Sequence, residues 1–193
     1  KPAFEIEDGY NQVPIYPLFL TQILYLLMFR NLDSQTALGR GNADGSTNYL
    51  NTGGTNAKTF NYGETTGRLQ MKFLGIEDFW GNRRWWIDGC FYDDNRNILI
   101  GKENFNDTGN GYENFGIASA ANLGGYVDKV QGGNNTGFIP TSTGGSETTY
   151  YSDYGNLYGG RLPYFGGYSG YGGAVGGFCL ASYVASDSHA AIG

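Results

Sequence analysis

The residues best suited to chemistry in this sequence of 193 residues include a single histidine, His189. It follows Asp187 by two positions, and such a pair can bind a metal ion or form part of a catalytic base. A His–Asp pair performs nucleophilic catalysis when a nucleophile is held beside it, and nothing in the local sequence supplies one. We therefore expect His189 to be an exposed polar side chain without a catalytic role.

Neighbouring acids are a second source of chemistry, and they occur in three groups: Glu77 with Asp78, Asp93 with Asp94, and Glu5 with Glu7 and Asp8. A glycosidase needs two carboxyl groups at a defined separation, which the sequence does not reveal, and paired acids in turns are usually solvated. One turn also contains four residues with oxygen atoms that could bind calcium: Asp93, Asp94, Asn95 and Asn97. Their spacing does not match the EF-hand pattern. We assign no catalytic residue and no metal ligand.

The glycines and cysteines give no support to a cofactor either. Among 33 glycines the sequence contains neither GxxxxGK[ST] nor GxGxxG, the spacings that hold phosphates. Cys90 and Cys179 are not part of a CxxC pair, and both lie in apolar contexts. One disulfide between them is an alternative, but we expect two free, buried thiols. The chain is therefore predicted not to be an enzyme and to carry no cofactor.

Tyrosine is the residue type that points to a function. Eight tyrosines fall within 34 residues, interleaved with glycine and serine: Tyr150, Tyr151, Tyr154, Tyr158, Tyr164, Tyr168, Tyr171 and Tyr183. Binding loops favour tyrosine because it offers a large amphipathic contact at low entropic cost, with serine and glycine as adaptable neighbours. The alternative is that these rings fill an irregular core. Their number favours a ligand-binding surface for a protein or a glycan.

The charge of the chain limits its partners. A net charge of −6 and a pI near 4.6 oppose binding to nucleic acid or to an anionic membrane surface. The most apolar segment, Leu18–Phe29, is shorter than the ~20 residues that span a bilayer, so no membrane insertion is expected.

These binding residues need a frame, and the sequence predicts few regular elements. Residues 18–30 are apolar nearly all round except at Thr21 and Gln22, which predicts a buried helix. Residues 83–101 alternate in a way that predicts a β-hairpin with its turn at 93–96. Residues 126–130 and 148–154 are further strand candidates, and residues 42–67 and 132–147 are expected to be loops.

Two segments resemble a known family. Ile76–Gly89 is similar to the "GIENFYGNxWEWVDG" segment of the phage-tail and cellular variable proteins that diversity-generating retroelements modify. Gly166–Leu180 is similar to their "GGxWxxGxxxGxFCL" segment, although Ser169 stands where the family has tryptophan. The resemblance implies an α+β architecture, the C-type lectin fold of the formylglycine-generating-enzyme branch, with small twisted antiparallel sheets, one or two helices and long loops. It further implies a single domain over residues 1–193, with a C-terminal variable region at 162–193.

The resemblance divides that region into a frame and a display set. The frame would contain Gly166, Gly167, Gly172, Gly176, Phe178, Cys179, Leu180, Ile192 and Gly193. Together with the tyrosine pattern, it places ligand contacts at Tyr164, Tyr168, Gly170, Tyr171, Ala174, Ala181, Tyr183, Val184, Ser186, Ser188, His189 and Ala191. We expect the frame to be buried and the display set to be exposed on one face.

The implied function is binding to a protein or glycan receptor on a target cell, by a surface that a retroelement diversifies. The implied location is the virion, at a phage tail, with the bacterial cell surface as the alternative. A homotrimer would add avidity, although no coiled-coil heptads are present. Two other functions remain open. One is a calcium-dependent lectin, whose Glu-Pro-Asn or Gln-Pro-Asp triplet is absent; the other is a formylglycine-generating-type enzyme, whose paired cysteines are not matched by Cys90 and Cys179.

Overall fold

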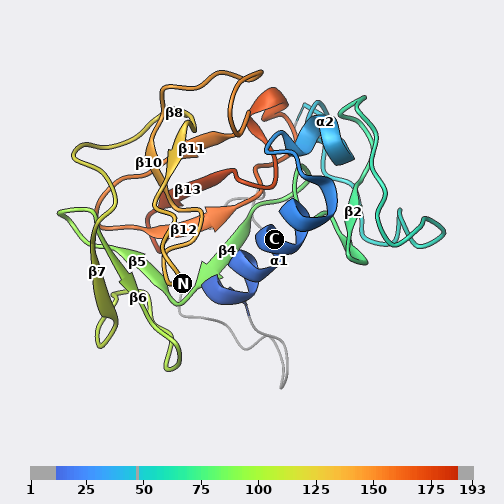
Figure 1. Ribbon diagram of the computed structural model, residues 1–193. Coiled ribbons are helices and arrows are strands. Elements are labelled where there is room, and N and C mark those ends of the chain that lie inside the picture. The colour runs from blue at the N-terminus through green and yellow to red at the C-terminus, as the bar shows by residue number, and fades with distance from the viewer. Residues whose placement is uncertain (1–11, 47, 187–193) are drawn as a thin grey trace.

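A six-stranded mixed sheet forms the centre of the computed structural model, which describes residues 12–46 and 48–186 (Figure 1). The strands lie in the order β1 (Val13–Pro14), β4 (Trp85–Asp88), β12 (Leu162–Phe165), β13 (Leu180–Tyr183), β11 (Tyr154–Asn156) and β8 (Gly125–Tyr126). The pairs β1–β4 and β11–β13 are parallel, and the other neighbours are antiparallel. Three of the six strands therefore come from the last 40 residues of the chain.

Three smaller sheets surround the central one. β5 (Cys90–Tyr92), β6 (Asn97–Ile100) and β7 (Glu113–Ile117) form an antiparallel meander. The two remaining pairs are β2 (Lys72–Phe73) with β3 (Ile76–Glu77), and β9 (Lys129–Val130) with β10 (Pro140–Ser142). With two α-helices and several small sheets in the described residues, the predicted α+β class is confirmed.

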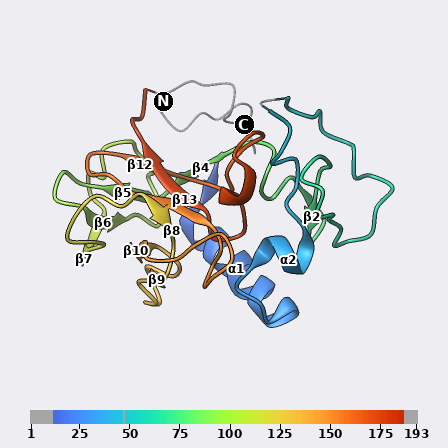
Figure 2. The same ribbon diagram turned by 90° about the horizontal axis from the view of Figure 1, so that it is seen from above.

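Helix α1 (Ile15–Phe29) packs against one side of the central sheet (Figure 2). It begins three residues earlier than predicted, after Pro14, and it ends where Arg30 takes a left-handed conformation and donates its N–H to the Leu26 carbonyl. The predicted burial of the whole helix is wrong. One face is buried in the core, but the opposite face is solvent-exposed, with Leu27 68% accessible.

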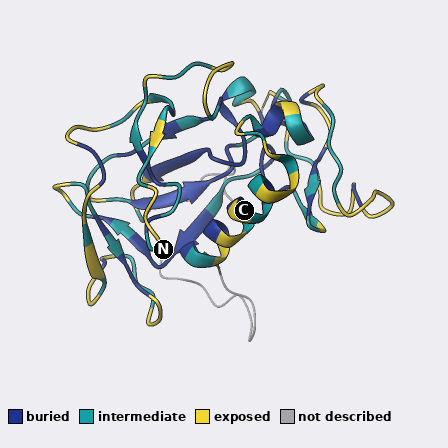
Figure 3. Cartoon of the chain, viewed as in Figure 1, coloured by how far each residue is buried: buried dark blue, intermediate teal, exposed yellow. Residues whose placement is uncertain are grey.

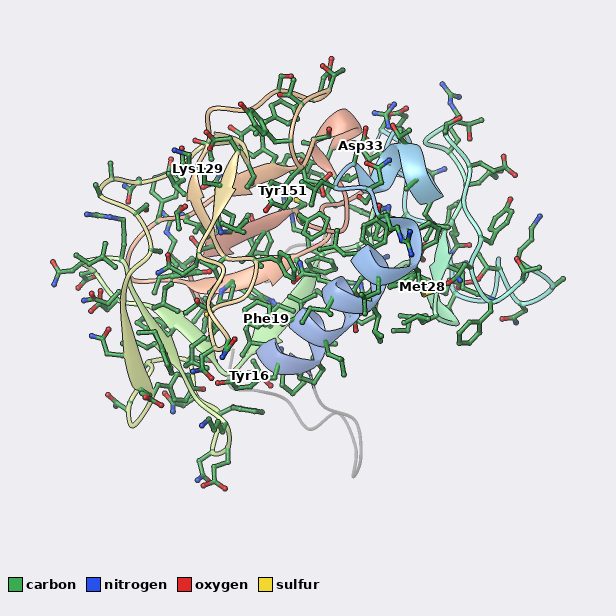
Figure 4. All side chains as sticks on the ribbon, in the orientation of Figure 1. Tyr16, Phe19, Met28, Asp33, Lys129 and Tyr151 are labelled. Atoms are coloured by element: carbon green, nitrogen blue, oxygen red, sulfur yellow. The ribbon has the colours of Figure 1, made fainter. Side chains whose placement is uncertain are left out.

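Among the α1 side chains labelled in Figure 4, Phe19 lies on the buried face and Met28 on the exposed face. The sheet covers α1 from one side alone, so the helix is not fully buried although it is apolar nearly all round. Gln22, expected to be a polar exception, lies on the buried face and donates from Nε2 to the Gly177 carbonyl at 2.9 Å. A second helix, α2 (Ser34–Leu38), is capped by Asp33, which accepts the Thr36 N–H.

The predicted hairpin at 83–101 is split by Gly89, which has φ 72° and turns the chain out of the central sheet. β4 belongs to that sheet, whereas β5 and β6 form the hairpin around the predicted turn. The alternation within β4 is confirmed, since Trp85 and Ile87 face the core and Trp86 faces the other side.

The strand expected at 126–130 is divided between β8 and β9, which belong to different sheets. Residues 148–153 form turns instead of the expected strand, and β11 starts at Tyr154. Figure 3 shows the outcome: buried strands at the centre and exposed loops around them. In the part of the chain that the structure describes, no helix is long and apolar enough to cross a membrane.

Candidate functional site

The side of the central sheet that faces away from α1 carries a row of aromatic residues. Tyr164 on β12 is paired with Trp86 on one side and with Ala181 on the other, so these three side chains lie on the same face. Leu162 and Tyr183 form the next pair on this face. Phe165 and its neighbour Leu180 belong to the opposite face and to the main core.

Ring contacts extend this row across the sheet and onto the loop that follows β12. Tyr126 and Tyr154 lie 5.6 Å apart between ring centroids, and Tyr154 lies 6.0 Å from Tyr171. Tyr171 is stacked on Tyr168 at 4.9 Å. We call this surface the tyrosine face and define it by Trp86, Tyr126, Tyr154, Tyr164, Tyr168, Tyr171 and Tyr183.

Two arginines sit among the rings of the tyrosine face. The Arg84 guanidinium carbon lies 4.1 Å from the ring centroid of Tyr168, 4.5 Å from that of Tyr164 and 5.4 Å from that of Tyr171. Arg161 lies 4.7 Å from the Tyr158 ring and 5.4 Å from the Tyr183 ring. All of these distances fall within the range of cation–π attraction.

Several members of the predicted display set lie at the surface. Tyr183 and Val184 are each 42% accessible, and Gly170 and Ser186 are also exposed. Tyr168 and Tyr171 are half-buried, so each presents part of its ring to solvent. Gly170 has φ 89°, a conformation that disfavours a side chain there.

Three members of the display set are buried, which corrects the expectation of exposure. Tyr164 is 6% accessible because Trp86 and Arg84 pack on its ring. Ala181 is 1% accessible because β13 runs between β12 and β11 at the middle of the sheet. Ala174 is 8% accessible at the end of the short 3-10 helix η1 (Gly172–Ala174). The remaining members, Ser188, His189 and Ala191, lie outside the described residues.

The predicted frame is buried where the structure describes it. Phe178, Cys179 and Leu180 are each at most 2% accessible. Gly176 has φ 148°, and a Cβ at this position would lie 2.1 Å from Oδ1 of Asp153, so glycine is required by both conformation and space. Gly172 is an exception, since it is half-buried, and Ile192 and Gly193 lie outside the described residues.

Ser169, which stands where the resembling family has tryptophan, is held in place by two hydrogen bonds. It is fully buried, its N–H donates to the Asn82 carbonyl at 2.9 Å, and its hydroxyl donates to the Asn48 carbonyl at 3.2 Å. The first bond attaches the loop after β12 to the segment before β4, and the second attaches it to residues 42–50.

A buried polar network fixes the segment between η1 and β13. Nε2 of Gln35 lies 2.9 Å from the Gly173 carbonyl oxygen and 2.8 Å from that of Val175. Oδ2 of Asp153 accepts the Phe178 N–H at 2.7 Å, and Oγ of Ser34 accepts the Gly177 N–H at 2.8 Å. Burial raises the pKa of Asp153 well above its ordinary value.

Of the acids considered as catalytic or metal-binding groups, Glu77, Asp78 and Asp93 accept hydrogen bonds that stabilise loops, whereas Glu5, Glu7 and Asp8 lie outside the described residues. Asp78 is buried, its Oδ2 accepts from Gln70 and Asn82 at 2.7 Å each, and desolvation raises its pKa to about 6. Glu77 accepts the N–H groups of Gly53 and Thr55, both at 2.6 Å. The two acids thus hold the 42–67 excursion against the β2–β3 pair.

Asp93 accepts the N–H groups of Asn95 and Asn97 within its own turn. The two cysteines are free and buried as expected, and desolvation raises the pKa of Cys90 to about 12, so its thiol is a poor nucleophile. In the described ranges, no group of three or more His, Cys, Asp or Glu side chains could hold a metal ion.

Sequence reasoning missed Arg84, Trp86, Tyr126 and the Gln35–Asp153 network as parts of the site. A signal for Arg84 and Trp86 was present, because both stand in the Ile76–Gly89 segment that resembles the family. The network had no local signal, since Gln35 and Val175 lie 140 positions apart.

Two surface hollows lie away from these rings. One is lined by Phe115, Gln131 and residues 133–136, and the other by residues of α2 together with Arg40, Thr65, Glu147, Thr148 and Gly173. Neither lining includes a residue of the tyrosine face. A scan against models of known protein families and searches of curated proteins and solved structures return no significant match.

Proposed function

We propose that this chain is a ligand-display domain that binds a receptor on a target cell through its tyrosine face. The observation that carries the proposal is the separation of two roles within residues 162–186. Phe178 and Leu180 are buried in the core, whereas Tyr168, Tyr171 and Tyr183 present ring surface to solvent. Tyrosine, tryptophan and arginine are also the side chains that contribute most to binding at protein interfaces.

The proposed fold is a C-type lectin fold. Its support is the sequence resemblance at Ile76–Gly89 and Gly166–Leu180 together with the small sheets, two helices and long loops of the described residues. On this proposal the exposed positions, including Tyr183, Val184 and Ser186, are those that a retroelement would rewrite. The proposed location is a phage tail, where a homotrimer would raise avidity for a weakly bound receptor.

The experiment is binding of the fluorescently labelled protein to a panel of bacterial cells. For a strain that binds, the Tyr168→Ala/Tyr183→Ala double variant is expected to lose at least about tenfold in apparent affinity, because it removes the exposed part of the rings. Phe60→Ala is the matched control, since Phe60 is an exposed aromatic residue on the 42–67 excursion, away from the tyrosine face.

Equal binding by the double variant and the wild type would reject the tyrosine face as the contact surface. A chelator arm tests the lectin alternative, because a calcium-dependent lectin would release the cells when calcium is removed. The display proposal predicts binding that is independent of the chelator.

A further inference from the structure

Aromatic rings surround the cationic side chain of Arg84, and within the described residues it forms no ion pair with an acid. In the ranges that the structure describes, no carboxylate lies within 4.0 Å of its guanidinium, whereas Arg40 pairs with Asp44 at 3.2 Å. Its Nε is enclosed and has no hydrogen-bond acceptor, but the residue as a whole is half-buried, and Nη1 and Nη2 are not among the enclosed nitrogens. The terminal N–H groups are therefore the donors that a partner can reach, and no acid in the described part of the chain competes for them.

The geometry around Arg84 determines which acceptor fits. The guanidinium of Arg84 lies over the ring faces of Tyr164 and Tyr168. The N–H donors of a guanidinium lie in its plane, and the edge formed by Nη1 and Nη2 makes no hydrogen bond to any residue that the structure describes, so it can donate to a partner. A carboxylate can accept two parallel N–H bonds along such an edge, and this is the strongest pairing that arginine forms with a protein side chain.

The charge of the chain makes this site unusual. The protein carries a net charge of −6, which repels anions in general. Arg161, 5.4 Å from the Tyr183 ring, adds a second cation to the same row of rings. An acidic group on a partner would therefore be directed to the tyrosine face by local attraction and away from the rest of the surface.

The composition of the surface favours a protein partner. The two hollows described above are lined by other residues. The side chains accessible on the tyrosine face and among its rings are tyrosines and arginines, including Tyr168, Tyr183 and Arg84, and both residue types are enriched at the centre of protein–protein interfaces.

We propose that Arg84 is the centre of a protein-docking surface and receives an aspartate or glutamate carboxylate of the partner. This inference rests on the proposed function and adds the chemistry of the partner to it. Tyr164 and Tyr168 are positioning residues here, because they hold the guanidinium through their rings. Tyr183 and Arg161 contact the partner around this centre.

The test is selection of a displayed library of random constrained peptides on the immobilised full chain. The selected peptides are expected to share an acidic position. Arg84→Gln is expected to weaken their binding about thirtyfold or more, and changing the shared Asp or Glu to its amide should cost a similar factor. The two changes made together should cost little more than either alone, which a double-mutant cycle reports as coupling.

Arg68→Gln is the matched control, because Arg68 is an exposed arginine outside the tyrosine face and its loss changes the net charge equally. Arg84→Lys keeps the charge but not the planar fork, and it is expected to restore less than half of the lost binding free energy. Thermal unfolding of each variant shows whether the fold is retained, and a variant that unfolds early is replaced by Arg84→Lys in the cycle.

Three results would overturn the inference. The selected peptides could lack a shared acidic position, or that position could couple to Arg161 and not to Arg84. The chain could instead bind glucuronate-terminated glycans in an Arg84-dependent way and select no acidic peptide, which would assign the site to a carbohydrate. None of these results would affect the cell-binding test of the tyrosine face, so the two proposals can fail separately.

Discussion

Replacement of Gln35 by methionine tests whether the buried polar network holds the display segment in place. Gln35 lies on α2, is 8% accessible, and its Nε2 is within 3.3 Å of four acceptors: the carbonyls of Ser152, Gly173 and Val175 and the carboxylate of Asp153. An amide nitrogen has two hydrogens, so the two shortest contacts, to Val175 and Gly173, account for most of the stabilisation.

The expected loss in the free energy of unfolding follows from those two contacts. Methionine has nearly the same length and volume as glutamine, so the substitution leaves little cavity and removes both donors. A buried carbonyl that loses its partner costs about 1–3 kcal/mol. The Val175 oxygen belongs to a fully buried residue and should cost the larger amount, whereas half-buried Gly173 can regain water. The expected loss in the free energy of unfolding is therefore about 2–4 kcal/mol.

The assay is urea denaturation followed by tryptophan fluorescence. Gln131→Met is the control, because Gln131 is a half-buried glutamine beside a surface hollow and should change stability by less than about 0.5 kcal/mol. A loss below about 0.5 kcal/mol for Gln35→Met would contradict a stabilising role for the Gln35 amide. It would mean that apolar packing and the bonds from Gly177 to Ser34 and from Phe178 to Asp153 suffice to hold the segment.

Three further predictions concern the frame. Burial raises the pKa of Asp78 to about 6, above its unfolded value near 4, so the folded state binds this proton more tightly. Asp78 therefore lowers the stability by about 1.4 kcal/mol per unit as the pH rises from about 4 to about 6. In urea titrations Asp78→Asn should reduce the slope of stability against pH by that amount, while the contributions of Asp88 and Asp153, whose pKa values burial also raises, remain. On α1, Leu18→Ala should cost about 2–5 kcal/mol and Leu27→Ala less than about 1 kcal/mol by thermal unfolding, and equal costs would contradict the exposed face. Gly176→Ala should cost about 2 kcal/mol or more, because its methyl group would collide with Asp153, and an unchanged urea midpoint would contradict that contact.

Much of the frame could be predicted from the sequence because its signals are local. The alternation of Trp85, Trp86 and Ile87 correctly placed these side chains on two faces of a strand. The Gly-Phe-Cys-Leu segment identified buried residues, since large apolar side chains between glycines have few alternatives to the core. The eight clustered tyrosines indicate a binding surface through their composition alone, because tyrosine beside glycine and serine is typical of binding loops.

The remaining features depend on contacts between distant parts of the chain. Ala181 matches a variable position of the resembling family, yet it is buried because strands from residues 154–165 pair on both sides of it. The apolar composition of α1 could not show that a sheet covers it from one side. Arg84 and Tyr171 lie far apart in sequence, and their contact appears when β4 and β12 pair.

The exposed display residues Tyr183, Val184 and Ser186 are carried by a frame that does not need them for folding. A substitution scan of residues 162–186, with protease resistance of the displayed protein as the readout, measures this independence. Most substitutions at Tyr183, Val184 and Ser186 should retain wild-type resistance, while most at Phe178 and Leu180 should abolish it. Equal sensitivity at Tyr183 and Phe178 would contradict the division into frame and display residues.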